Sequence, residues 1–210
     1  MSLESQLAAL KTSARTPDPV AVSELLAKEA RSRPLKVGDR APTFTLRAYE
    51  GISVSSSDYL DLGPLVITFY RGLWCPYCQG DLQSFDEAFD RIRDLGASFL
   101  AISRPRQPGL DMPADHGLHL RFPILEDVTG TVAVQFGIRW SPDDIQLIEE
   151  VFGHDIGNFR DAEPWITPMQ ARFVIDRDGM IARSEIAFDY RQKSDPTDLM
   201  SILTDLQRQR

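Results

Sequence analysis

The sequence is poor in cysteine, with two among its 210 residues, which excludes a small secreted scaffold held together by several disulfide bonds. It also has no apolar run near the roughly 20 residues that a membrane-spanning helix needs. Residues 1–7 lack the positive charge and the apolar stretch of a signal peptide. We therefore expect a soluble, cytoplasmic protein that buries a substantial hydrophobic core and needs no disulfide bonds to fold.

Positive charge is not in excess either. The chain has 23 Lys and Arg against 31 Asp and Glu, a formal net charge of −8, and its arginines form no basic stripe. This balance argues against nucleic acid or an anionic membrane as a partner. The sequence shows no internal repeat, glycine-rich phosphate loop, nucleophilic serine motif or nucleotide fingerprint, so we predict no cofactor and no metal.

The two cysteines that are present, Cys75 and Cys78, belong to one motif, WCPYC at residues 74–78. The motif follows an apolar, β-rich run at residues 65–70 and opens a stretch with helical periodicity. Backbone N–H groups and the helix dipole favour a thiolate at the start of a helix. Because the thiolate is the nucleophile, this position predicts a reactive Cys75 and thiol redox chemistry.

Apolar periodicity and turn residues predict a mixed order of strands and helices. A hairpin at residues 44–54 precedes the strand at 65–70, and Pro76 and Gly96 fit the two ends of a helix at 76–95. The elements expected after it are a strand at 97–102, a brief strand at 122–125, a short helix at 128–136, a strand hairpin within 172–187 and a final helix from 195. This order predicts an α/β fold with a mixed, mostly parallel sheet covered by helices on both faces.

Two parts of the chain are expected to lie outside that core. Residues 1–35 have a leucine stripe at helical spacing and predict an N-terminal helical arm, so that the main domain covers residues 36–210. Residues 103–120 are predicted to form a loop. Residues 137–168 are predicted to form a surface insertion, with a helix near 145–151.

Three sequence blocks carry a resemblance to a known family: VGDRAPTFTL at residues 37–46, FYRGLWCPYC at 69–78 and FVIDRDG at 173–179. With these blocks the chain resembles the alkyl hydroperoxide reductase and thiol-specific antioxidant superfamily, in its peroxiredoxin-like branch. The resemblance implies a thioredoxin-like fold and a thiol peroxidase. It further implies that Cys75 is the peroxidatic cysteine and Cys78 its resolving partner, with a peroxide as substrate, a thioredoxin- or glutathione-type reductant and a homodimer as the assembly.

The chain departs from the family pattern at three positions. Typical peroxiredoxins have proline and Thr or Ser seven and three residues before the peroxidatic cysteine, where this chain has Thr68 and Gly72. The hydroxyl that orients a peroxide is therefore absent at Gly72. Gln170 occupies the position of a typical arginine. Arg172 lies two residues along the same strand, on the same face, and is a candidate substitute.

Further residues are candidates for supporting roles. Arg71 is a candidate to lower the pKa of Cys75 and to stabilise the transition state, and the alternative is an arginine that is solvated or paired with a carboxylate. Trp74 is expected to shield the thiolate and to form a docking surface. Pro76 belongs to the first turn of the helix, and Tyr77 sets the polarity at its start.

Other readings of the same residues stay open. The cysteine pair also suits a thiol–disulfide oxidoreductase that acts on protein disulfides, or a non-catalytic interaction module that keeps the fold. A zinc site that adds His116 and His119 to the pair is a weaker hypothesis, because neither histidine lies in a metal-binding knuckle. The cysteines are also compatible with a pair of inert buried thiols.

Overall fold

The computed structural model describes residues 33–73, 75–105, 119–139, 168–187 and 195–208. Most of the arm predicted at residues 1–35, the helix predicted near 145–151, Trp74 and His116 lie outside these ranges. The predicted boundary between the arm and the main domain therefore stays a prediction. Among the described residues, no helix combines the length and the apolar character needed to cross a membrane.

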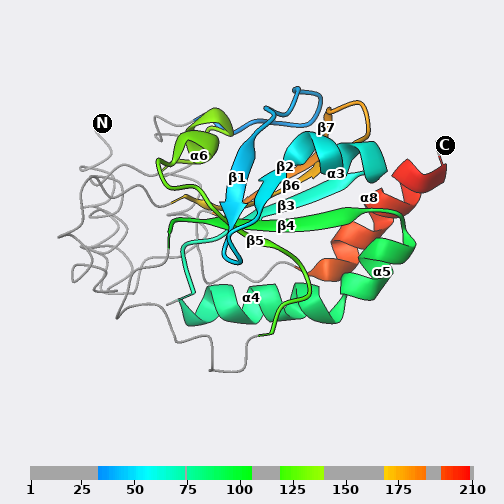
Figure 1. Cartoon of the computed structure of the whole chain (residues 1–210). Helices are drawn as coiled ribbons and strands as arrows, with labels where there is room; N and C mark the ends of the chain where they lie inside the picture. Colours follow the sequence, from blue (N-terminus) through cyan, green and yellow to red (C-terminus); the bar gives the residue numbers. More distant parts are fainter. Residues whose placement is uncertain (1–32, 74, 106–118, 140–167, 188–194, 209–210) are drawn as a thin grey trace, which may run out of the picture.

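The described residues form a seven-stranded sheet with the strand order β2-β1-β5-β4-β3-β6-β7 (Figure 1). The predicted hairpins at both ends of the sheet are confirmed, and so are the apolar strands at its centre. The strands are β1 (Thr45–Ala48), β2 (Ser53–Ser55), β3 (Leu65–Phe69), β4 (Ser98–Ser103), β5 (Ile124–Glu126), β6 (Gln170–Ile175) and β7 (Ile181–Ala187).

The sheet is mixed, as expected, but the prediction that it is mostly parallel is wrong. Only β3 with β4 and β4 with β5 pair in parallel, whereas the other neighbouring strands are antiparallel. An apolar run indicates that a strand is buried, but its direction depends on the connection that leads into it. Here β6 enters beside β3 in the opposite direction and turns back into β7.

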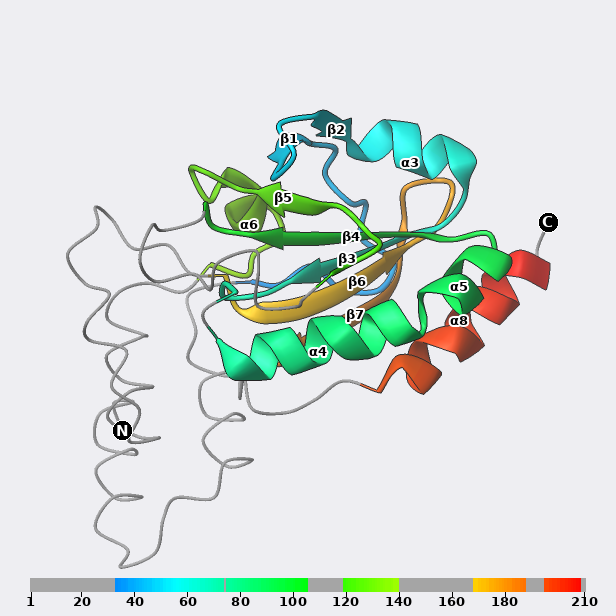
Figure 2. The same ribbon diagram turned by 60° about the horizontal axis from the view of Figure 1, so that its bottom comes forward.

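Helices cover both faces of the sheet, as predicted (Figure 2). The helices α3 (Ser56–Leu62) and α6 (Thr131–Gln135) pack on one face, and α4 (Pro76–Glu87), α5 (Phe89–Asp94) and α8 (Pro196–Arg208) pack on the other. Every side chain of β3 is buried, and they alternate between the two faces. β3 is thus a central strand, and the cysteine motif follows it directly.

The helix predicted at residues 76–95 is divided in two at Ala88, which has φ −86° and ψ −2°. Arg121 holds this junction: its amide donates to Oδ1 of Asp86 over 2.7 Å and its Nη1 donates to Asp90 over 2.8 Å. The Arg121 guanidinium also lies 5.5 Å from the centre of the Phe89 ring. Arg121 comes from a distant part of the chain, so the helical periodicity of residues 76–95 did not reveal the break.

The helix α3 was not expected from the sequence, because its seven residues carry too few apolar positions to define a period. Contacts with the preceding hairpin fix its start. The amide of Phe44 donates to Oγ of Ser56 over 3.0 Å, and the amide of Ser56 donates to the carbonyl of Phe44 over 3.0 Å.

Candidate active site

The cysteine motif lies where the buried strand β3 passes into helix α4. Cys75 occupies the residue before the helix, and Pro76 opens the first turn, as the sequence predicts. Within the connecting turn the amide of Cys75 donates to the carbonyl of Gly72 over 3.2 Å, and Gly72 has φ +148°. A residue with a Cβ rarely adopts this backbone conformation, so the turn itself requires glycine at position 72.

The structure brings the two thiols together at the end of α4 that faces this turn. Both cysteines are free and buried. The pKa of Cys75 is lowered to about 6, chiefly because the Cys78 thiol donates a hydrogen bond to its sulfur. Burial opposes this effect, whereas the backbone N–H groups of Cys78 and Tyr77 and the charge of Arg71 add to it.

Cys78 responds in the opposite direction. Its pKa is raised well above the usual value, first because its proton is engaged with Cys75, and then because it is buried and faces the Cys75 charge. The pair therefore holds one proton at neutral pH, and that proton resides on Cys78. Of the two thiols, Cys75 is therefore the one that ionises more readily.

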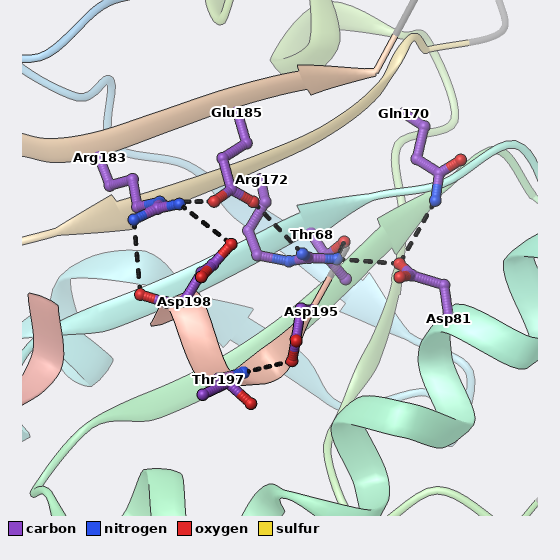
Figure 3. Close-up of polar contacts among 9 residues, drawn as sticks. All are labelled: Thr68, Asp81, Gln170, Arg172, Arg183, Glu185, Asp195, Thr197 and Asp198. Atoms are coloured by element: carbon purple, nitrogen blue, oxygen red, sulfur yellow. Dashed lines mark hydrogen bonds and ion pairs between the residues drawn. The ribbon is translucent and has the colours of Figure 1, made fainter. Parts of the chain in front are cut away.

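The two candidate arginines have different surroundings. Arg71 is 7% exposed and its charge lowers the pKa of Cys75, in agreement with the predicted electrostatic role. Arg172 is 3% exposed and forms a 2.9 Å ion pair with Asp81 of α4, which is equally buried (Figure 3). The ion pair connects Arg172 to helix α4. A direct action of Arg172 on the Cys75 thiolate stays a prediction.

Several contacts hold Arg172 in this position. Its Nη1 lies 3.5 Å from Glu185 of β7, its Nη2 lies 3.5 Å from Oγ1 of Thr68, and its guanidinium lies 3.8 Å from the centre of the Phe85 ring. Removing one partner of such a buried pair costs several kcal/mol, because the other charge remains in a medium of low polarity. The network fixes α4, and with it the cysteine pair, on the sheet.

Asp81 is a residue of the site that the sequence analysis missed. It lies one helical turn after Cys78 and four residues before Phe85, on the apolar face of α4. A carboxylate at an apolar position of a helix was the available signal, since such a group is rarely buried without a partner. Gln170, which stands at the position of a typical arginine, donates to the same Asp81 Oδ2 over 3.3 Å (Figure 3).

The remaining supporting residues have smaller roles. Tyr77 is 41% exposed, so its side chain lies at the surface beside the motif, while its N–H acts on Cys75. The side-chain amide of Gln79 donates to the carbonyl of Leu73 and closes the turn against the helix. Of the two histidines in the zinc hypothesis, only His119 is described, and no cluster of potential metal ligands occurs among the described residues.

Fold and site together define a thioredoxin-like α/β protein with an activated cysteine pair. The model of the AhpC/TSA family matches residues 37–184, and the chain belongs to this family. The resemblance found in the sequence blocks is thereby confirmed.

Relatives of known sequence and structure agree with this assignment. Peroxiredoxin Bcp of Escherichia coli K12 is 32% identical over 105 residues, which are 50% of this chain and 66% of the relative. The thiol-disulfide oxidoreductase ResA of Bacillus cereus is 21% identical over 130 residues, which are 59% of this chain and 74% of ResA. The structure of peroxidoxin BcpB from Mycobacterium tuberculosis superposes with a TM-score of 0.62 at 22% identity, covering 81% of this chain and 97% of BcpB. The chain thus spans slightly less than two thirds of peroxiredoxin Bcp, and the structural likeness confirms the fold.

Proposed function

We propose that this protein is a thiol-dependent peroxidase that reduces hydrogen peroxide or an organic hydroperoxide. The Cys75 thiolate attacks one oxygen of the peroxide bond, forms a sulfenic acid and releases water or an alcohol. The Cys78 sulfur then attacks the Cys75 sulfur, a disulfide forms, and the sulfenic oxygen leaves as water. The observation that carries this proposal is the buried thiol pair in which the pKa of Cys75 is about 6 and Cys78 keeps the proton.

The completed cycle needs a reductant, since the disulfide must be reopened by thiol–disulfide exchange. We assign this role to a thioredoxin- or glutathione-type thiol in the cytoplasm. We include a homodimer in the proposal, whereas nucleic acid and membranes are not expected as partners. The similarity to peroxiredoxin Bcp supports the peroxidase reaction.

A second function, thiol–disulfide exchange on protein substrates, is favoured by two observations. Position 72 is a glycine in a conformation that other residues rarely adopt, and the orienting hydroxyl of typical peroxiredoxins is absent there. ResA, which is named a thiol-disulfide oxidoreductase, is also similar to this chain. The two functions share the same nucleophile and differ in the electrophile that Cys75 attacks.

Rapid mixing of the fully reduced protein with hydrogen peroxide distinguishes them. We expect Cys75 to be oxidised far faster than free cysteine at the same pH, and the Cys75→Ser variant to show no such phase. Tryptophan fluorescence is a suitable signal, because Trp74 adjoins Cys75 in the sequence. An oxidation rate equal to that of free cysteine would contradict the peroxidase and leave disulfide exchange as the function.

A further inference from the structure

A row of polar side chains crosses the face of the sheet that α4 covers. Tyr70 is the first residue after β3, and its amide continues the pairing with β4 by donating to the carbonyl of Ile102 over 3.1 Å. Continuing the registers of β3 with β4 and with β6 places Tyr70 between Ser103 and Gln170. All three side chains are buried. Three neighbouring strands thus present buried polar groups on this face, next to the network of Arg172 and Asp81.

Tyr70 belongs to the same buried cluster as Cys75 and Cys78. It is 1% exposed, and its hydroxyl forms no hydrogen bond of ordinary geometry with any described residue. A buried hydroxyl without a partner destabilises the folded state, which makes a role in the reaction a reason for its presence. Burial raises the pKa of Tyr70 well above its usual value, so the hydroxyl keeps its proton.

The neighbouring hydroxyls are engaged elsewhere. Ser103 donates its proton to the carbonyl of Arg104 over 2.9 Å, and its Oγ lies 3.4 Å from the hydroxyl of Tyr49. Since the proton of Ser103 is used, Tyr49 is the donor of that second contact. Tyr49 and the charge of Cys78 raise the pKa of Tyr70, whereas the hydroxyl of Ser103 lowers it, so the four groups lie close together. Tyr70 is the member whose hydroxyl has no partner of ordinary hydrogen-bond geometry among the described residues.

The resolving step creates a need for such a proton donor. Cys78 is completely buried and must lose its proton before its sulfur attacks Cys75. In that step the Cys78 proton passes to the leaving group, the bond between the two sulfurs forms, and the bond from Cys75 to its oxygen or sulfur substituent breaks. Negative charge develops on the Cys78 sulfur in a buried site, where a preorganised donor is most effective.

We propose that the Tyr70 hydroxyl donates a hydrogen bond to the Cys78 sulfur as it becomes anionic, which makes Tyr70 a catalytic residue of the resolving step. The proposal rests on the proposed thiol chemistry but not on a particular oxidant, because Cys78 resolves a sulfenic acid and a mixed disulfide in the same way. The charge of Arg71 acts on the first step at Cys75, whereas Tyr70 acts on the second.

The small disulfide dithiodipyridine separates the two steps without any peroxide. Attack by Cys75 releases the first thiopyridone, and attack by Cys78 on the mixed disulfide releases the second. In the full-length reduced Tyr70→Phe protein we expect the first release within about twofold of the unchanged protein and the second about tenfold slower at neutral pH. The pH midpoint of the second release should rise. Tyr59→Phe is the matched control, because Tyr59 packs on the opposite face of the sheet and its substitution should leave both releases unchanged.

If Tyr70→Phe leaves the rate and the pH profile of the second release unchanged, the proposal is overturned. Equal slowing of both releases would also overturn it, because it indicates altered packing. Should Tyr70→Phe fail to fold, a ring-fluorinated tyrosine at position 70 keeps the shape and makes the hydroxyl a stronger donor. We then expect a faster second release, and an unchanged one refutes the role. If peroxide oxidises Cys75 no faster than free cysteine while Tyr70→Phe still slows the second release, the peroxidase fails and the role of Tyr70 stands.

Discussion

The low pKa of Cys75 depends most on the thiol of Cys78, and this leads to a quantitative prediction for Cys78→Ala. The pKa of Cys75 falls from an ordinary 9.0 to about 6 in the folded protein. If the largest of the lowering effects accounts for half of this change, its removal raises the titration midpoint by about 1.5 pH units, which corresponds to about 2 kcal/mol. The ionised fraction of Cys75 at pH 7 then drops from about 90% to about 25%.

Alkylation with iodoacetamide across a range of pH measures this midpoint, because only the thiolate reacts. In Cys78→Ala the single remaining thiol is Cys75, so the signal is unambiguous. Cys78→Ser keeps a hydroxyl donor at the same place, and we expect its midpoint to lie between those of the unchanged protein and of Cys78→Ala. If Cys78→Ala titrates within about 0.3 pH units of the unchanged protein, the hydrogen bond between the two residues is not the cause of the low pKa.

Two further substitutions test the surroundings of the thiol pair. Arg71→Gln should raise the pKa of Cys75 by less than Cys78→Ala does and should slow the first oxidation of Cys75, whereas Arg71→Lys should keep the pKa low. The pH profile of alkylation measures the pKa in both variants. An unchanged profile in Arg71→Gln would disprove the role of the charge. Asp81→Asn should lower the free energy of unfolding by about 3 kcal/mol or more, since Arg172 remains buried and charged. Urea unfolding of the reduced protein measures this loss, and Asp90→Asn, which breaks only an exposed pair with Arg121, should cost less than about 1 kcal/mol. Equal losses in the two variants would mean that the buried pair contributes no more than a surface contact.

Local sequence patterns predicted the parts of the fold that depend on local physics. The apolar run at residues 65–70 and the alternating strands of the two hairpins correspond to β3 and to β1, β2, β6 and β7. Pro76 opens α4, as expected from its fixed φ. The position of Cys75 before that helix predicted a lowered pKa, and the N–H groups of Cys78 and Tyr77 contribute to it, but its largest cause is the Cys78 thiol.

Features that depend on contacts between distant residues could not be predicted. The break at Ala88 is stabilised by Arg121, which comes from another part of the chain. The direction of β6 beside β3 is a property of the whole topology. The strand pattern placed Arg172 on the correct face of β6, but only the packed structure shows that its partner is Asp81. The sequence pattern placed Tyr70 at the end of an apolar strand. Only the pairing of β3 with β4 and β6 shows that its hydroxyl is buried beside Ser103 and Gln170.

The conformation of Gly72 limits how easily this site could be converted into that of a typical peroxiredoxin. Because φ is +148° at this residue, introducing the missing Thr or Ser would impose a backbone penalty of about 1–3 kcal/mol before any hydroxyl reached a substrate. A single substitution therefore does not interconvert the two kinds of active site; the path of the backbone between β3 and α4 would have to change as well. The difference between the two kinds of site thus lies in the backbone of the turn as well as in the side chain at position 72.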